Sequence, residues 1–284
     1  MKKLLQLTIL FLLSPYLLNA QSGKVLDNLS LKSNILNMDR KFAIYLPADY
    51  ESSNRSYPVL YLLHGAGDDE TGWIQKGEVM FIADKAINSG KATAMIIVMP
   101  DASRGRRGYY NDINGKFRYE DFFFEEFIPY IEKTYRVRSD KSYRAIAGLS
   151  MGGGGTLIYA LHRPDMFSSA CPLSASIRRF PNISKADSTG SVLTSEQIER
   201  YTNNHDAIYL AENMPDDQKT QVRWYIDCGD DDFLYEGNSL LHIAMRKKEI
   251  PHEYRVRNGS HTWTYWRSAL PEVLAFVSQS FHRY

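Results

Sequence analysis

The chain has 284 residues, of which 44% are hydrophobic and 24% charged, an ordinary globular composition with enough length for a large core. The formal net charge is +1, which argues against the basic surface that nucleic-acid binding requires. Length alone fits either one large domain or two small ones.

The first 20 residues have the pattern of a secretory signal peptide. Two lysines precede an apolar stretch, and Ala20 is the small residue expected before a cleavage point. The apolar stretch at 4–13 is shorter than the roughly 20 residues that a membrane-spanning helix needs. We therefore expect cleavage near Ala20, a periplasmic or secreted protein, and a mature domain of residues 21–284 without stable membrane insertion. Loss of the two lysines changes the net charge from +1 to −1.

The rest of the chain alternates apolar extended segments with helical ones. Strands are predicted in 25–47 (two segments, the second from about Arg40 to Leu46), at the start of 57–73, and in 92–102, 143–150, 166–176, 222–230 and 252–258. Helices are predicted in 119–135, 152–163, 238–248 and 270–281.

This alternation favours an α/β fold with a mostly parallel sheet covered by helices on both faces. The first strands need not be parallel. Residues 177–221 depart from the pattern because they are rich in Ser, Asp and Asn. We expect this segment to be an insertion or cap over the edge of the sheet rather than a second domain.

The two cysteines, Cys171 and Cys228, lie in apolar, strand-like stretches. Two cysteines in a chain of this length do not make a disulfide framework, so buried free thiols are favoured. A single bridge stays open as an alternative because an exported protein meets oxidising conditions.

A serine stands between glycines in the stretch Gly148-Leu149-Ser150-Met151-Gly152. This matches G-x-S-x-G, the nucleophile elbow of the α/β-hydrolase fold, with an apolar strand before it and a helix after it. Each glycine in a helix costs roughly 1 kcal/mol relative to alanine. The run at 152–155 therefore predicts a helix that lies unusually close to the adjoining strands.

A serine hydroxyl becomes a good nucleophile only when a base takes its proton. In this fold an acid and then a histidine follow the serine in the chain. His261 is the predicted base because it lies in a loop just after the last predicted strand, whereas His252 opens that strand and His242 lies within a helix.

The acid must lie between the serine and the base, at the end of a strand. Asp227, Asp230, Asp231 and Asp232 meet that requirement. Asp227 falls inside the apolar strand, where a buried structural role is possible. Spacing does not choose among the other three.

Acyl chemistry also needs two backbone N–H groups that receive the negative charge on the carbonyl oxygen. Met151, the residue after the nucleophile, is the first expected donor. The second is expected in the loop His64-Gly65-Ala66-Gly67, which is similar to an HGGG-type loop. Ala66 is our choice, with Gly65 next to it, and His64 would hold the loop.

Five blocks now resemble one family of esterases, in the expected order and over nearly all of the mature chain. The family includes esterase D, bacterial feruloyl and acetyl-xylan esterases, and mycolyltransferases. The blocks are YPVLYLLHGAGDDETGW, AMIIVMPDA, AGLSMGG, CGDDDFLYEGN and GSHTWTYW.

The resemblance implies a choice of acid, because the family's aspartate follows a glycine and precedes an apolar pair. Asp232 before Phe233-Leu234 fits this pattern, and Asp231 stays open because the run of three aspartates blurs the register. The resemblance also implies substrate-binding aromatic residues. These are Tyr109 and Tyr110 in a cleft-lining loop, and Trp263 and Trp266 after the histidine, with ordinary packing as the alternative role.

The function implied is an exported serine carboxylic-ester hydrolase. We expect a feruloyl esterase that removes acyl groups from plant cell-wall polysaccharide such as xylan. An acetyl-xylan or other acetyl esterase, and an acyltransferase to a sugar acceptor, are the alternatives. No cofactor and no metal are expected. The acidic turn after Gly229 lacks the glycine and terminal glutamate of a known calcium loop.

Overall fold

The structure is a computed structural model that describes residues 22–103, 108–177 and 192–282. The expected signal segment, 1–20, lies outside these ranges. No helix within them is long and apolar enough to cross a membrane.

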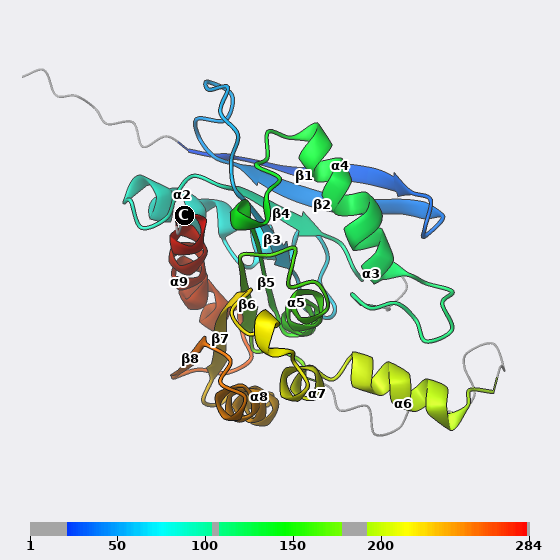
Figure 1. The fold of residues 1–284 in the computed structure, drawn as a ribbon. Coiled ribbons are helices and arrows are strands. Elements are labelled where there is room, and N and C mark those ends of the chain that lie inside the picture. The colour runs from blue at the N-terminus through cyan, green and yellow to red at the C-terminus, as the bar shows by residue number, and fades with distance from the viewer. Residues whose placement is uncertain (1–21, 104–107, 178–191, 283–284) are drawn as a thin grey trace, which may run out of the picture.

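Eight strands form one sheet in the order β1-β2-β4-β3-β5-β6-β7-β8 (Figure 1). β2 is antiparallel to both β1 and β4, and every later pair is parallel. This confirms the predicted α/β fold, in which the first strands depart from the parallel pattern. The strands are β1 (Lys24–Ser33), β2 (Met38–Leu46), β3 (Val59–Leu63), β4 (Ile96–Pro100), β5 (Arg144–Leu149), β6 (Ser169–Leu173), β7 (Arg223–Gly229) and β8 (His252–Arg257).

The helices form two layers, one on each face of the sheet. Figure 1 shows α2 and α9 on one side of the sheet, and α4, α5 and α8 on the other. Two clusters of buried apolar residues result, one beneath each layer. The helices are α1 (Gly72–Gln75), α2 (Val79–Asn88), α3 (Tyr119–Asp121), α4 (Ile128–Thr134), α5 (Met151–His162), α6 (Ser195–Asn204), α7 (Ala207–Glu212), α8 (Tyr235–Lys247) and α9 (Trp263–Phe281); a π-helical stretch, Phe122–Phe127, joins α3 to α4.

The helices differ from prediction at several places. α9 begins seven residues earlier than expected, because the Thr262 hydroxyl accepts a hydrogen bond from the N–H of Tyr265 and caps the helix there. The sequence pattern did not predict α1 and α2, which lie between β3 and β4, or α6 and α7, which lie between β6 and β7.

The cap over the sheet edge that is expected from 177–221 stays a prediction, because the structure describes only part of this segment. Its helix α7 packs against α5 and α8, in the layer over one face of the sheet. Residues 178–191 lie outside the described ranges. The Tyr201 hydroxyl of α6 donates a hydrogen bond to the carbonyl of Asn111, which ties the segment to the loop before α3.

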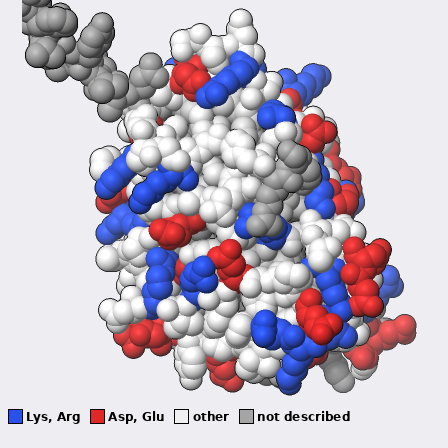
Figure 2. All heavy atoms as spheres, turned by 60° about the vertical axis from the view of Figure 1, so that its left-hand side comes forward, with Lys and Arg blue, Asp and Glu red and all other residues white. Residues whose placement is uncertain are grey.

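Cys171 and Cys228 are both free and buried. The face that Figure 2 shows carries positive and negative side chains interspersed, with no gathering of either sign. Such a face offers no continuous basic track for a nucleic-acid backbone.

The glycine run at the start of α5 lets the helix touch the ends of the strands. A Cβ on Gly152 would lie 2.5 Å from the carbonyl oxygen of His64, and one on Gly148 would lie 2.5 Å from that of Gly152. Both obstacles are backbone atoms and cannot rotate away. The three glycines that follow meet similar obstacles from the residues after β6 and from the loop at 109–110.

We predict that Gly152→Ala lowers the free energy of unfolding by about 3 kcal/mol or prevents folding, because the added methyl displaces packed backbone. Urea unfolding measures the change. The control is Gly237→Ala in α8, where the nearest atom is the Ile177 Cβ at 3.2 Å and alanine favours the helix. Equal midpoints for Gly152→Ala and the wild type would contradict the packing argument.

Candidate active site

Ser150 lies at a sharp corner between β5 and α5. Its backbone has φ 54° and ψ −115°, which is outside the regions that residues other than glycine usually adopt. Three hydrogen bonds hold it: its N–H donates to the Leu173 carbonyl, and its carbonyl accepts from Gly154 and Ser176, all at 2.9–3.0 Å. Such a conformation costs of order 1–3 kcal/mol and persists where the surroundings enforce it.

His261 and Asp232 come to this corner from two other loops. His261 Nε2 lies 2.9 Å from Ser150 Oγ, and His261 Nδ1 lies 2.9 Å and 3.0 Å from the two Asp232 carboxylate oxygens. Because a carboxylate only accepts, Nδ1 carries the proton and Nε2 is free to accept from the serine hydroxyl. The structure thus brings the three predicted residues into one hydrogen-bonded chain.

The Asp232 carboxylate is fully buried yet remains ionised. Burial raises its pKa, but hydrogen bonds from His261, the Leu234 N–H and the Ser174 hydroxyl lower it, and the net pKa is below the ordinary value. Ser174 in turn accepts a hydrogen bond from the indole nitrogen of Trp266, at 3.1 Å. The acid is therefore oriented by contacts on both sides.

The neighbouring aspartates have a different task. Asp230 Oδ1 accepts the N–H of Gly259 at 2.9 Å, and the N–H of Asp231 donates to the Gly259 carbonyl at 3.0 Å. Gly259 is in the loop that carries His261. Of the candidates that spacing left open, Asp232 contacts the histidine, while Asp230 and Asp231 tether its loop.

Asp227, the fourth candidate, is buried and binds both ends of the same loop. Its carboxylate accepts from Arg257 at 2.6 Å, just before the loop, and from the Tyr265 hydroxyl at 2.5 Å, just after it. The Tyr225 hydroxyl completes the set at 3.1 Å. The sequence had left a structural role open for Asp227, and these contacts show that its carboxylate holds the two ends of the loop that carries His261.

We predict that Asp227→Asn lowers the free energy of unfolding by about 2 kcal/mol, because Arg257 loses the carboxylate that it pairs with. Breaking a fully buried pair costs about 3–5 kcal/mol; the Arg257 side chain is 31% exposed, which reduces the loss. Urea unfolding measures it.

The matched control is Asp231→Asn, an exposed position whose tether to the loop is made by its backbone. We expect a change within about 0.5 kcal/mol there. Equal effects of the two substitutions would show that the carboxylate of Asp227 does not hold the loop.

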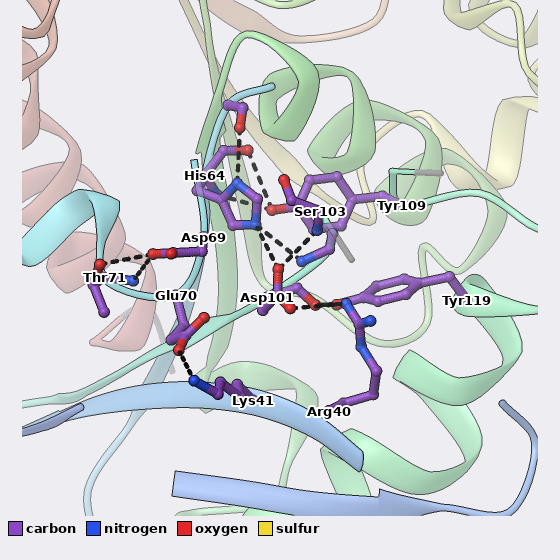
Figure 3. A network of polar contacts seen from close by, with 12 residues as sticks. Arg40, Lys41, His64, Asp69, Glu70, Thr71, Asp101, Ser103, Tyr109 and Tyr119 are labelled. Carbon is purple, nitrogen blue, oxygen red and sulfur yellow. Dashed lines mark hydrogen bonds and ion pairs between the residues drawn. The ribbon is translucent and has the colours of Figure 1, made fainter. Parts of the chain in front are cut away.

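The loop after β3 is fixed by the His64 side chain. Its Nδ1 donates to the Gly65 carbonyl at 2.8 Å, and its Nε2 accepts the N–H of Ala102 at 2.9 Å (Figure 3). Burial lowers the pKa of His64, which keeps the ring neutral and able to accept at Nε2. Figure 3 also shows Asp101, before Ala102, bound by Arg40 from β2.

This fixed loop lies against the serine corner. A Cβ on Gly65 would lie 3.4 Å from the Ser150 Cβ. In the described part of the chain, the N–H groups of Ala66 and Met151 have no hydrogen-bond partner. This is compatible with the expected role of both groups as oxyanion donors, which stays a prediction.

The four predicted substrate-binding aromatic residues lie in different surroundings. Tyr109 is buried, and its hydroxyl bonds to the backbone N–H and carbonyl of His64, so it supports the loop and does not reach the surface. Tyr110 is half-buried, with its ring 5.0 Å from that of His205. Trp266 is buried with its ring edge-on to His261 at 4.9 Å, and Trp263 is half-buried against Trp266 at 5.4 Å.

One aromatic residue at the site was not predicted from the sequence. Phe233, directly after Asp232, is exposed, and its ring centroid lies 4.5 Å from that of His261. Its position directly after the expected acid, in an otherwise polar turn, is the sequence feature that could have indicated a place at the site. Within the described ranges, the active site included, no group of three or more His, Cys, Asp or Glu residues is arranged to hold a metal.

A mostly parallel sheet with a strained serine after β5, an acid after β7 and a histidine after β8 defines an α/β hydrolase. The model of the family described as "Putative esterase" matches residues 33–277. The chain belongs to that family.

Individual relatives agree with this assignment. The chain is 41% identical over 135 residues to an endo-1,4-beta-xylanase/feruloyl esterase of Xylanibacter ruminicola, covering 44% of this chain and 18% of that protein. It is 30% identical over 250 residues to Esterase Rv1288 of Mycobacterium tuberculosis, covering 78% and 52%. The chain therefore spans about half or less of the length of these relatives. A solved ferulic acid esterase superposes with a TM-score of 0.80 at 38% identity, covering 91% of this chain and 99% of the other.

Proposed function

We propose that this protein is an exported serine esterase that removes feruloyl groups from plant cell-wall polysaccharide. The observation that carries the proposal is the chain of hydrogen bonds from Ser150 through His261 to Asp232. The likeness to a ferulic acid esterase along nearly the whole of both chains supports the choice of acyl group. Export rests on the sequence of residues 1–20.

In the first step, Ser150 Oγ attacks the ester carbonyl while His261 Nε2 takes the hydroxyl proton. The ionised Asp232 holds Nδ1–H and stabilises the imidazolium that forms. The carbonyl oxygen becomes an oxyanion, which the N–H groups of Met151 and Ala66 receive. Loss of one such donor costs about 3–4 kcal/mol.

The tetrahedral intermediate then collapses. The bond to the sugar oxygen breaks, Nε2–H gives its proton to that oxygen, and the feruloyl group stays on Ser150. A water molecule next gives a proton to His261 Nε2 and attacks the acyl carbonyl. Ferulic acid leaves, and the proton on Nε2 returns to Ser150.

We predict that Ser150→Ala lowers kcat on methyl ferulate by roughly ten-thousandfold or more, because no nucleophile remains. Release of ferulate measured by absorbance gives the rate, and a fluorophosphonate probe should label the wild type and not the variant. Ser239→Ala in α8 is the control and should retain full activity. Activity retained by Ser150→Ala would show that Ser150 is not the nucleophile.

We further predict that the wild type hydrolyses methyl ferulate with a higher kcat/KM than it deacetylates acetylated xylan. The two products, ferulate and acetate, are measured in parallel at equal ester concentrations. The reverse order would make the protein an acetyl esterase. A drop in free ferulate on addition of a sugar acceptor, with a new ferulate ester formed, would make it an acyltransferase.

A further inference from the structure

The base of the site is in contact with an aromatic ring that points into solvent. Phe233 is 72% exposed, and its ring lies 4.5 Å from the His261 ring at an angle of 51°. Single exposed apolar residues are common and by themselves mean little. Among the exposed large apolar residues of the described ranges, Phe233 is the one whose ring contacts His261.

The backbone on both sides of Phe233 is fixed. Asp232 Oδ1 accepts the N–H of Leu234 at 2.8 Å, and the Asp232 carbonyl accepts the N–H of Tyr235 at 2.9 Å. The same carboxylate holds His261. The backbone of Phe233 is therefore held beside the catalytic chain, so the ring is attached at a fixed place next to His261.

The chemistry tells which part of the substrate this surface meets. His261 Nε2 faces Ser150 Oγ and, under the proposed function, must protonate the departing alcohol oxygen. The alcohol part of the ester therefore lies on the His261 side of the nucleophile. Trp266 covers the imidazole edge-on from the buried side, which leaves Phe233 as its aromatic neighbour toward solvent.

We propose that Phe233 is a binding platform for the sugar ring that carries the ester oxygen. A sugar has a polar rim of hydroxyl groups and an apolar face of C–H bonds. An exposed phenylalanine ring offers an apolar surface of matching size, and covering it removes apolar area of both partners from water. This inference rests on the proposed function and adds the alcohol subsite to it.

Two ferulate esters with different alcohols test the platform. Methyl ferulate carries no sugar, whereas a feruloylated arabinoxylan oligosaccharide carries the same acyl group on a sugar. For Phe233→Ala we expect the ratio of kcat/KM, oligosaccharide over methyl ferulate, to fall roughly tenfold, mainly through a higher KM of the oligosaccharide. Phe233→Tyr keeps the ring and should keep the ratio within about twofold of the wild type.

The control is Phe81→Ala, which removes a ring that is 64% exposed on α2 and should leave the ratio unchanged. Binding of the oligosaccharide to the Ser150→Ala protein, with and without Phe233→Ala, supplies a readout that needs no turnover and should weaken by a similar factor. An unchanged ratio, or an equal loss on both esters, overturns the platform; equal loss would place the ring against the acyl group or show that it only positions His261. A wild type that hydrolyses neither ester would refute the proposed function, which is a separate result.

Discussion

The rest of the site depends on the left-handed backbone of Ser150. A side chain at this corner stands clear of both the strand and the helix, so its hydroxyl can meet a base that arrives from elsewhere in the chain. The corner exists only if α5 presses against the ends of the strands, which requires residues without a Cβ. The glycines therefore cost helix propensity, and close packing with three backbone hydrogen bonds at Ser150 offsets that cost.

The second requirement is that a loop brings the imidazole to this corner with little freedom. The loop after β8 is tied at its two ends by the buried Asp227 and near its middle by Asp230 and Asp231 through Gly259. Asp232 then holds the imidazole itself. Four carboxyl-bearing residues within six positions thus act on one loop, and the ones that do not reach His261 restrict the motion of the backbone that carries it. A base misplaced by about 1 Å can cost a hundredfold in rate, so this restraint serves the chemistry directly.

Sequence alone predicted all eight strands, and the inner ones carry continuous apolar runs, such as Val59–Leu63, that are typical of strands covered on both faces. It also pointed to Ser150 and His261, since a local glycine pattern and chain order single them out. Sequence patterns did not distinguish Asp232 from the adjacent aspartates, because shifting the turn by one residue would place another aspartate at the same position. The family resemblance supplied that choice. Placement of α7 against α5 and α8, and burial of Tyr109 under His64, depend on contacts between distant segments that no local pattern reports.

Exposure rises along the chain of groups from the acid to the rim of the site. The Asp232 side chain is 0% exposed, that of His261 is 17% exposed, and Phe233 is 72% exposed. A charge pair that forms during reaction is strongest where water is excluded, so the carboxylate acts on the imidazolium from the buried side. The proposed polymeric substrate, by contrast, can approach only from solvent, so a group that contacts its sugar would have to lie outermost. The order of burial therefore matches the order of the proposed tasks: charge stabilisation in the interior, proton transfer at the boundary, and contact with a large alcohol at the surface.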